Sequence, residues 1–151
     1  MAGSTHNHNL IQGDLGFGIK SALRSLKSSC DTVGSNQKIY VAPRTIFYPD
    51  LTVICGNGSI TAQQGLKNPV AVFEVLSPST QAYDRTGKFE AYKQIESLRH
   101  YVLLEQDRPT VTHYVKGDNG AWTTIATHNA LTDSLQLTLG GATVTVPLAH
   151  I

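Results

Sequence analysis

The sequence has little of what marks several common classes of protein. Its two cysteines lack CxxC or CxxH spacing, so neither a zinc cluster nor a thioredoxin-like motif is supported. Lys and Arg total 12 against 11 for Asp and Glu, with no block of like charge, so the composition lacks the basic footprint of many nucleic-acid-binding proteins. The glycines of GDLGFG do not fit G-x-G-x-x-G and follow no strand, which argues against a Rossmann domain.

Long apolar runs are also lacking. No apolar stretch approaches the roughly 18 residues that a membrane span needs, and the opening MAGSTHNHNLIQ has neither the basic segment nor the apolar core of a signal peptide. We therefore expect a soluble, cytoplasmic protein that forms one domain over residues 1–151. In that compartment Cys30 and Cys55 are expected to be reduced, buried thiols.

Periodic patterns predict a helix, then strands, then a second helix. Apolar residues at steps of three and four predict an amphipathic helix over 9–26, although three glycines weaken it. DTVGSNQKIYVAP is typical of a turn and a short extended run, and RTIFYPDLTVICG of a strand broken at Pro49. After a loop over 56–69, a strand over 70–76 and a helix over about 85–97 are predicted, with Ser79, Thr80 or Asp84 as the helix cap.

The C-terminal third is predicted to consist of strands and hairpins. A strand over 100–106 precedes one hairpin around Asp118-Asn119-Gly120 and two short strands around Gly140-Gly141. The complete order predicts an α/β centre with an antiparallel extension, which is an α+β mixture and not a doubly wound sheet.

One carboxylate lies inside the predicted buried strand. Glu74 interrupts the apolar run VAVFEVL, where an unpaired carboxylate is costly to desolvate. A second acid, Asp50, follows Pro49 directly, and a hard divalent cation can be held by one or two such carboxylates. Position 76 lies on the same strand face as Glu74, where a lysine could serve this site, but it is a leucine. The lysine that could serve the site is therefore Lys88 of the next helix.

The phrases YPD, VFEVLSPST and DRTGKFEAY together resemble the PD-(D/E)XK nuclease superfamily. Within it they resemble the Uma-type family (number two) of restriction endonucleases, which shows an acid after proline, the phrase E-V-L-S-P-S-T and a lysine moved into the following helix. Weaker likeness extends through HNLIQGDL, YVLLEQD and GAW. The resemblance implies a restriction-endonuclease-like core, in which helices flank a mixed central sheet, with antiparallel C-terminal hairpins.

Carried over to this sequence, the resemblance implies a metal-dependent endonuclease that acts on DNA. Asp50, Glu74 and the backbone carbonyl of Val75 would bind Mg²⁺ or Mn²⁺, Lys88 would be the catalytic lysine, and Tyr92 would lie in the substrate pocket. His8 aligns with a histidine at the start of the family's first helix, which implies a lesser pocket role. Family members also carry an E-x-x-x-G-E segment before that helix, so the domain is expected to lack an N-terminal segment usual in the family.

Other interpretations stay open at this stage. The chain can be a catalytically inactive nuclease-fold module for binding or assembly, or a mobile-element remnant without a selected activity. Singly, Asp50 is a common turn residue, Glu74 can reach solvent or an arginine, and Lys88 can be solvated. A homodimer is expected through the C-terminal hairpins, where Val111, Tyr114 and Trp122 are available as contact residues.

Overall fold

The computed structural model describes residues 4–58, 60–61 and 64–151. Three helices and ten strands are assigned in this part of the chain, with a final 3-10 turn at Leu148–His150. No helix in these ranges is both long enough and apolar enough to cross a membrane. In chain order the elements are α1 (His6–Ser25), β1 (Cys30–Gly34), β2 (Ile39–Ala42), β3 (Thr45–Phe47), β4 (Leu51–Cys55), β5 (Ala71–Val75), α2 (Gln81–Arg85), α3 (Gly87–Tyr92), β6 (His100–Leu104), β7 (Val111–Lys116), β8 (Trp122–His128), β9 (Ser134–Leu139) and β10 (Ala142–Pro147).

Six strands form one central sheet in the order β1-β4-β5-β6-β7-β8. The β5–β6 pair is parallel and is connected through α2 and α3, whereas the other neighbours in the sheet are antiparallel. The pairs β2–β3 and β9–β10 are separate two-stranded sheets. The predicted α+β class, with a mixed central sheet and antiparallel C-terminal hairpins, is confirmed.

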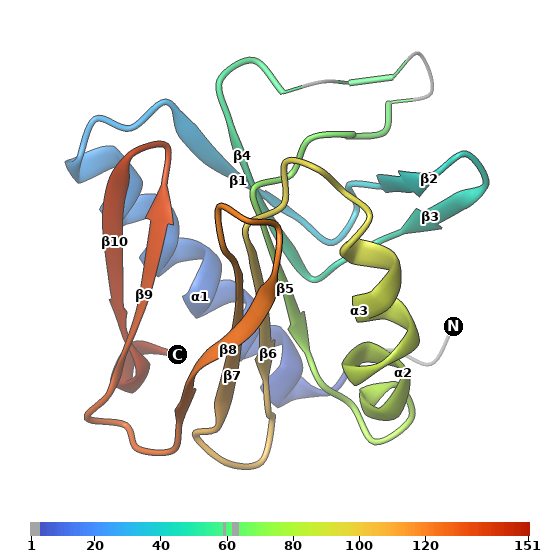
Figure 1. Ribbon diagram of the computed structural model, residues 1–151. Helices are drawn as coiled ribbons and strands as arrows, with labels where there is room; N and C mark the ends of the chain where they lie inside the picture. The colour runs from blue at the N-terminus through green and yellow to red at the C-terminus, as the bar shows by residue number, and fades with distance from the viewer. Residues whose placement is uncertain (1–3, 59, 62–63) are drawn as a thin grey trace.

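Two layers cover the central sheet, one on each face (Figure 1). Helix α1 and the β9–β10 hairpin bury one apolar cluster against the sheet, and α3 with β2 buries a second cluster on the other face. Strand β5 lies between the two clusters: Phe73 belongs to the first and Val72 to the second. Burial on both faces explains why its sequence is continuously apolar.

Helix α1 packs closely on strands β10 and β4 because glycines lie at these contacts. A β-carbon at Gly18 would lie 3.0 Å from Cγ1 of Val146, and one at Gly16 would lie 3.4 Å from Cδ1 of Leu51. The helix begins three residues before the predicted start, since Thr5 is its N-cap and its hydroxyl accepts a hydrogen bond from the His8 amide at 3.1 Å.

The predicted helix over 85–97 is wrong in its bounds and its continuity. Helical structure begins at Gln81, breaks at Thr86 (φ −124°, ψ −93°) and ends at Tyr92. The break brings Gly87 against the ring of Tyr83, where a β-carbon would lie 2.7 Å from Cε2. Of the three predicted caps, Thr80 is the N-cap residue, although its side chain makes no capping hydrogen bond, and Asp84 lies inside α2.

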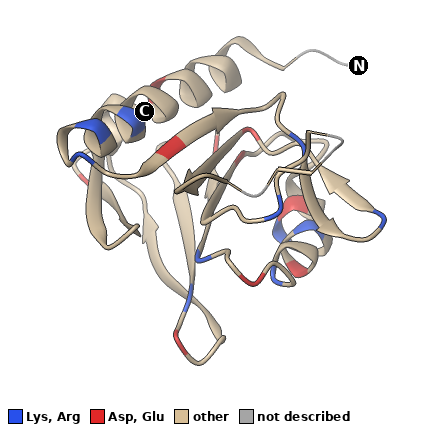
Figure 2. Ribbon diagram, turned by 90° about the horizontal axis from the view of Figure 1, so that it is seen from above, with Lys and Arg blue, Asp and Glu red and all other residues tan. Residues whose placement is uncertain are grey.

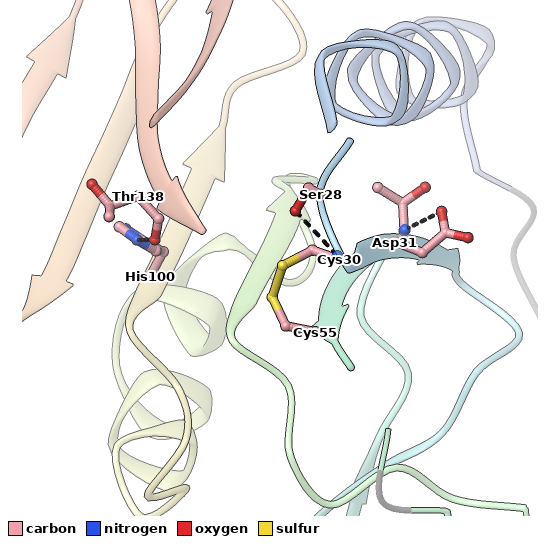
Figure 3. The surroundings of a disulfide bond; sticks show 7 residues. Ser28, Cys30, Asp31, Cys55, His100 and Thr138 are labelled. Atoms are coloured by element: carbon pink, nitrogen blue, oxygen red, sulfur yellow. Dashed lines mark hydrogen bonds between the residues drawn. A yellow bond between two sulfur atoms is a disulfide. The ribbon is translucent and has the colours of Figure 1, made fainter. Parts of the chain in front are cut away.

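The two cysteines are joined in a disulfide, so the prediction of reduced thiols is wrong (Figure 3). Strands β1 and β4 pair in a register that sets Cys30 directly opposite Cys55. The amide of Cys30 donates a hydrogen bond to the hydroxyl of Ser28 at 3.1 Å, which ties this corner to the segment after α1. The 25-residue separation gave no hint of the pairing, because the register depends on how the intervening segment folds.

The residues predicted as a dimer contact differ in how far they are buried. Val111 is 4% exposed, and the rings of Tyr114 and Trp122 pack on Phe89 with centroid distances of 4.5 and 5.4 Å. Val111 is therefore not available as a surface contact, whereas Tyr114 and Trp122 are only partly buried against the cluster on the other face of the sheet. Homodimerisation itself remains a prediction.

Candidate active site

The site lies at the end of β5, where the two layers on either side of the sheet approach each other. Strands β4 and β5 pair with Leu51 opposite Phe73 and Thr52 opposite Val72. One further step of this register places Asp50 opposite Glu74. The ladder has already ended there, so the amide of Val75 is free to donate to the Asp50 carboxylate, with 2.7 Å between N and Oδ2.

Helix α1 holds Asp50 from the other side. His8 Nε2 lies 2.8 Å from Oδ1 of Asp50, and both side chains are largely buried. The side-chain amide of Gln12, one turn further along α1, donates to the backbone carbonyl of Asp50 at 2.7 Å. The carboxylate therefore has two partners that fix its orientation, the side chain of His8 and the amide of Val75.

Lys88 reaches Glu74 from helix α3. Glu74 is 3% exposed, and its Oε1 lies 2.7 Å from Nζ of Lys88. The hydroxyl of Tyr92, one turn after Lys88, donates to the same oxygen at 3.2 Å. Glu74 thus neither reaches solvent nor meets an arginine, and the structure brings together all the residues that the sequence placed in this pocket.

Asp84 is a third acid in the pocket, and its role here was missed. Its side chain is 4% exposed and lies 3.2 Å from Nζ of Lys88, four residues later. The hydroxyl of Tyr101 donates to the Asp84 backbone carbonyl at 2.8 Å and fixes this turn of α2. The i,i+4 spacing of Asp84 and Lys88 was a usable signal, because such residues share one face of a helix. Assignment of Asp84 as a candidate cap obscured it.

The pocket holds more acid than base. Burial raises the pKa of Glu74 to about 8 against the opposing effect of Lys88, and the charges of Asp50 and Asp84 add to the increase. Burial by itself would lower the pKa of Lys88, but the charges of Glu74 and Asp84 outweigh it, so the pKa is raised and the ammonium is kept. Burial also raises the pKa of Tyr92, which remains a neutral donor.

A second group of polar contacts ties neighbouring elements to the site, and sequence reasoning missed it. Glu105 accepts from Arg85 at 2.9 Å and from Arg108 at 2.7 Å. Gln106 donates to the carbonyl of Leu76 and accepts from the hydroxyl of Thr5. These contacts join the segment after β6 to α2, to the end of β5 and to the start of α1.

The acids are not gathered as a ready cluster of metal-binding side chains. Within the part of the chain that the structure describes, no group of three or more His, Cys, Asp or Glu side chains is arranged to hold a metal ion. Lys88 lies between Glu74 and Asp84 as their shared counter-ion. Asp50 interacts with His8 and the Val75 amide. The arrangement is a paired, desolvated charge network.

The fold of the chain matches that of a solved structure. A solved structure from Anabaena variabilis ATCC 29413, described as a "putative nuclease belonging to DUF820", superposes with a TM-score of 0.68. The match has 14% sequence identity and covers 89% of this chain and 73% of that one, so it shows a shared fold. A model of the Uma2 family, described as "Putative restriction endonuclease", matches residues 1–148. The chain belongs to this family, and the resemblance seen in its motifs is confirmed.

Two curated relatives from Synechocystis sp. (strain ATCC 27184 / PCC 6803 / Kazusa) are similar over most of this chain. The uncharacterized protein slr1290 is 33% identical over 123 residues, which are 81% of this chain and 64% of that protein. The uncharacterized protein sll1609 is 31% identical over 128 residues, which are 81% of this chain and 70% of that protein. The chain thus spans about two-thirds of the length of these relatives.

Proposed function

We propose that this chain is a divalent-metal-dependent endonuclease that hydrolyses phosphodiester bonds in DNA. The observation that carries the proposal is the buried network at the end of β5, in which Glu74 and Asp84 share the ammonium of Lys88 and Asp50 binds the amide of Val75, the residue after Glu74. Membership of a family described as restriction endonucleases supports the choice of reaction. In the proposal Asp50 and Glu74 bind the metal and Lys88 is the catalytic lysine.

The donor set fits a hard cation. Mg²⁺ prefers oxygen ligands and often takes only one or two carboxylates, with water and phosphate in its other positions. In an extended strand the N–H and C=O of one residue point to the same edge, so the carbonyl of Val75 lies on the edge where its amide meets Asp50. These three groups would hold Mg²⁺ or Mn²⁺, which when bound would supply Lewis-acid activation of a phosphate oxygen and an acidified water.

The remaining residues hold charges in place. Lys88 has two carboxylate partners, so Asp84 can keep the ammonium in the pocket when Glu74 takes up another partner. The ammonium then supplies positive charge for the oxygens of a scissile phosphate. Tyr92 orients Glu74, and His8 orients Asp50. In this assignment Asp84, Tyr92 and His8 are positioning residues.

The direct test is cleavage of supercoiled plasmid by the purified chain with Mg²⁺ or Mn²⁺. Glu74→Gln and Lys88→Met are each expected to slow cleavage by roughly 100-fold or more, the usual loss when one preorganised charge-stabilising group is removed. Glu90→Gln in α3 and Lys93→Met directly after it are matched controls, because these two side chains form a surface ion pair at 2.6 Å. Both controls should keep wild-type activity.

Circular dichroism of each variant confirms that it is folded, and a parallel reaction on RNA tests the choice of substrate. Cleavage that persists in folded Glu74→Gln would overturn the assignment. Titration calorimetry with Mn²⁺ gives an independent reading, since the heat of binding should vanish in Asp50→Ala. A wild-type chain that neither binds Mn²⁺ nor cuts DNA would instead be an inactive binding or assembly module.

A further inference from the structure

An exposed aromatic ring adjoins the candidate active site. Among the described residues, three Phe or Tyr side chains are more than half exposed: Phe17 at 76%, Tyr48 at 56% and Tyr83 at 54%. Tyr48 is two residues before Asp50, and Tyr83 directly precedes Asp84. A single exposed ring is common on a protein surface, so the groups around it decide what it can do.

The ring of Tyr83 is fixed by its neighbours and still open to water. A β-carbon at Gly87, one helical turn later, would lie 2.7 Å from Cε2 of this ring, so the ring rests directly on the backbone at the helix break. The ring of Phe47 from β3 packs against it, with centroids 6.4 Å apart and planes at 81°. A ring fixed in this way loses little conformational entropy when a flat ligand stacks on it.

Phe47 connects this ring to the proposed catalytic lysine. Nζ of Lys88 lies 5.8 Å from the centre of the Phe47 ring, and the ring of Tyr92 packs on Phe47 at 5.2 Å. The two distances through Phe47 add, so the Tyr83 ring lies within about 12 Å of the Lys88 ammonium. Bases in one DNA strand are about 3.4 Å apart, so a base on Tyr83 would lie within about four nucleotides of a phosphate at Lys88.

The basic side chains around the site are mostly paired with acids already. Arg85 lies 2.9 Å from Glu105, and Arg108 lies 2.7 Å from the same carboxylate. Lys88 is held by two carboxylates, and Figure 2 shows acidic and basic positions interleaved along α2 and α3. Arg44, in the turn between β2 and β3, forms no ion pair among the described residues and is available for one phosphate.

This balance of charge favours stacking over phosphate contacts. Duplex DNA is held largely by Lys and Arg side chains that neutralise its phosphates, and few of these remain unpaired beside the site. A single strand can also be held by its bases, because every base has a flat face that stacks on an aromatic ring.

We infer that the chain binds unpaired DNA, with a base stacked on the ring of Tyr83 and the adjoining backbone directed to Lys88. In a duplex both faces of each base are covered by its neighbours, so a fixed ring can stack only on a base that has left the helix. The inference rests on the proposed endonuclease function. It narrows the substrate of that function to single-stranded or locally unpaired DNA.

The test compares the binding of a single-stranded oligonucleotide and of its duplex to the whole chain, by fluorescence anisotropy in EDTA. EDTA removes the metal on which the proposed cleavage depends, so the DNA stays intact. The wild type should bind the single strand roughly 10-fold or more tightly than the duplex. Tyr83→Leu should weaken single-strand binding by roughly 10-fold or more, the usual effect of removing one stacking ring, and Tyr83→Phe should retain it.

The leucine variant separates loss of stacking from loss of the fold. Leucine is still apolar against Gly87 and Phe47 and favours a helix, but it has no flat face for a base. Circular dichroism should show it folded. Phe17→Leu is the matched control, because Phe17 is an exposed ring on α1, which covers the other face of the sheet. This control should keep the wild-type affinity.

A strand that carries one 2-aminopurine gives a reading that a merely structural role of Tyr83 would not change. The fluorescence of this base falls when it stacks on a ring. It should fall on binding to the wild type and to Tyr83→Phe, but not on binding to Tyr83→Leu.

Three results would overturn the inference: equal affinity of the wild type for single strand and duplex, full single-strand affinity in folded Tyr83→Leu, or an equal loss in Phe17→Leu. Cleavage of both substrates with Mn²⁺ distinguishes this inference from the proposed function. A chain that binds the single strand through Tyr83 but cuts no DNA contradicts only the nuclease proposal. A chain that binds and cuts the duplex as well as the single strand contradicts only the inference.

Discussion

At the scale of single residues, the buried charged side chains depend on one another for stability. Lys88 lies between two carboxylates that are almost fully removed from water, Glu74 and Asp84. Removing one partner from such a group leaves an uncompensated buried charge, which typically costs about 3–5 kcal/mol. Asp84 therefore matters both for keeping Lys88 in the pocket and for tolerating Glu74 inside an apolar strand.

A second buried polar pair lies on the opposite face of the sheet, away from the site. His100 Nδ1 and His113 Nε2 are 3.0 Å apart, and both side chains are at most 5% exposed. His100 Nε2 lies 3.0 Å from the carbonyl of Thr138 on β9 (Figure 3), so this nitrogen carries the proton. His100 Nδ1 is then the acceptor, and His113 Nε2 donates to it.

These two histidines predict a loss of stability in acid. Burial lowers the pKa of His100, and burial with the nearby His100 and His128 lowers the pKa of His113 to about 3. The unfolded chain takes up protons at the ordinary value of 6.5 that the folded chain refuses, so stability falls as pH drops from about 6.5 to about 3. The slope is up to roughly 1.4 kcal/mol per pH unit for each histidine.

The measurement is the free energy of unfolding in urea from pH 7 to pH 4, for the wild type and for His113→Gln. The raised pKa of Glu74 acts in the opposite direction in part of this range, so the difference between the two proteins is the informative quantity. The unfolding free energy of the wild type minus that of His113→Gln should decrease as the pH falls. A difference that stays constant would mean that the two histidines do not resist protonation in the folded chain.

At the scale of elements, the edge of the sheet that supplies Asp50 is held by a covalent link. The Cys30–Cys55 disulfide joins β1 to β4 and closes a loop that contains the β2–β3 hairpin. Asp50 immediately precedes β4, so the disulfide and the acid lie at opposite ends of the same strand. The disulfide-closed loop therefore supports the position of Asp50 indirectly.

Removal of the disulfide is expected to destabilise the chain by about 3 kcal/mol, because a loop of this length gains substantial entropy in the unfolded state. The comparison is urea unfolding of the wild type and of the Cys30→Ser, Cys55→Ser double variant. Dithiothreitol should destabilise the wild type to a similar extent and leave the double variant unchanged. Two free thiols found by mass spectrometry of the unreduced wild type would contradict this prediction.

The sequence predicted most elements but not their ends or interruptions. Apolar spacing was sufficient for α1, β5 and the C-terminal strands, since each buries a continuous stripe or face. The apolar spacing predicted one continuous helix and did not indicate the break at Thr86, which brings Gly87 against the ring of Tyr83. The two short helices place Asp84 and Lys88 on either side of that break.

At the scale of the whole molecule, the site depends on three layers meeting at one end of the sheet. Helix α1 supplies His8, the sheet supplies Glu74, and the layer of α2 and α3 supplies Lys88 (Figure 1). Any ligand that binds the folded arrangement and not the unfolded chain must stabilise all of these contacts together. Metal binding is therefore expected to appear as increased global stability.

Saturating Mn²⁺ should raise the melting temperature of the wild type. At a free concentration 100 times the dissociation constant, the gain in unfolding free energy is about 2.7 kcal/mol. Chelation with EDTA should reverse the shift, and Glu74→Gln should abolish it, whereas Glu90→Gln should retain it. An equal shift in both variants would place the bound ion elsewhere.

The sequence by itself indicated the family, the approximate order of elements, and Asp50, Glu74 and Lys88 as candidate site residues. Sequence motifs and apolar periodicity are local properties and can be read without the fold. Tertiary structure decided what these residues touch. The pairing of Cys30 with Cys55 and the entry of Asp84 into the pocket depend on strand register and on the angle between short helices. The strand register is set by packing between segments distant in the chain. The i,i+4 spacing indicated that Asp84 can meet Lys88, but the burial of Asp84 depends on how α2 packs on the sheet, where Tyr101 of β6 donates to its carbonyl.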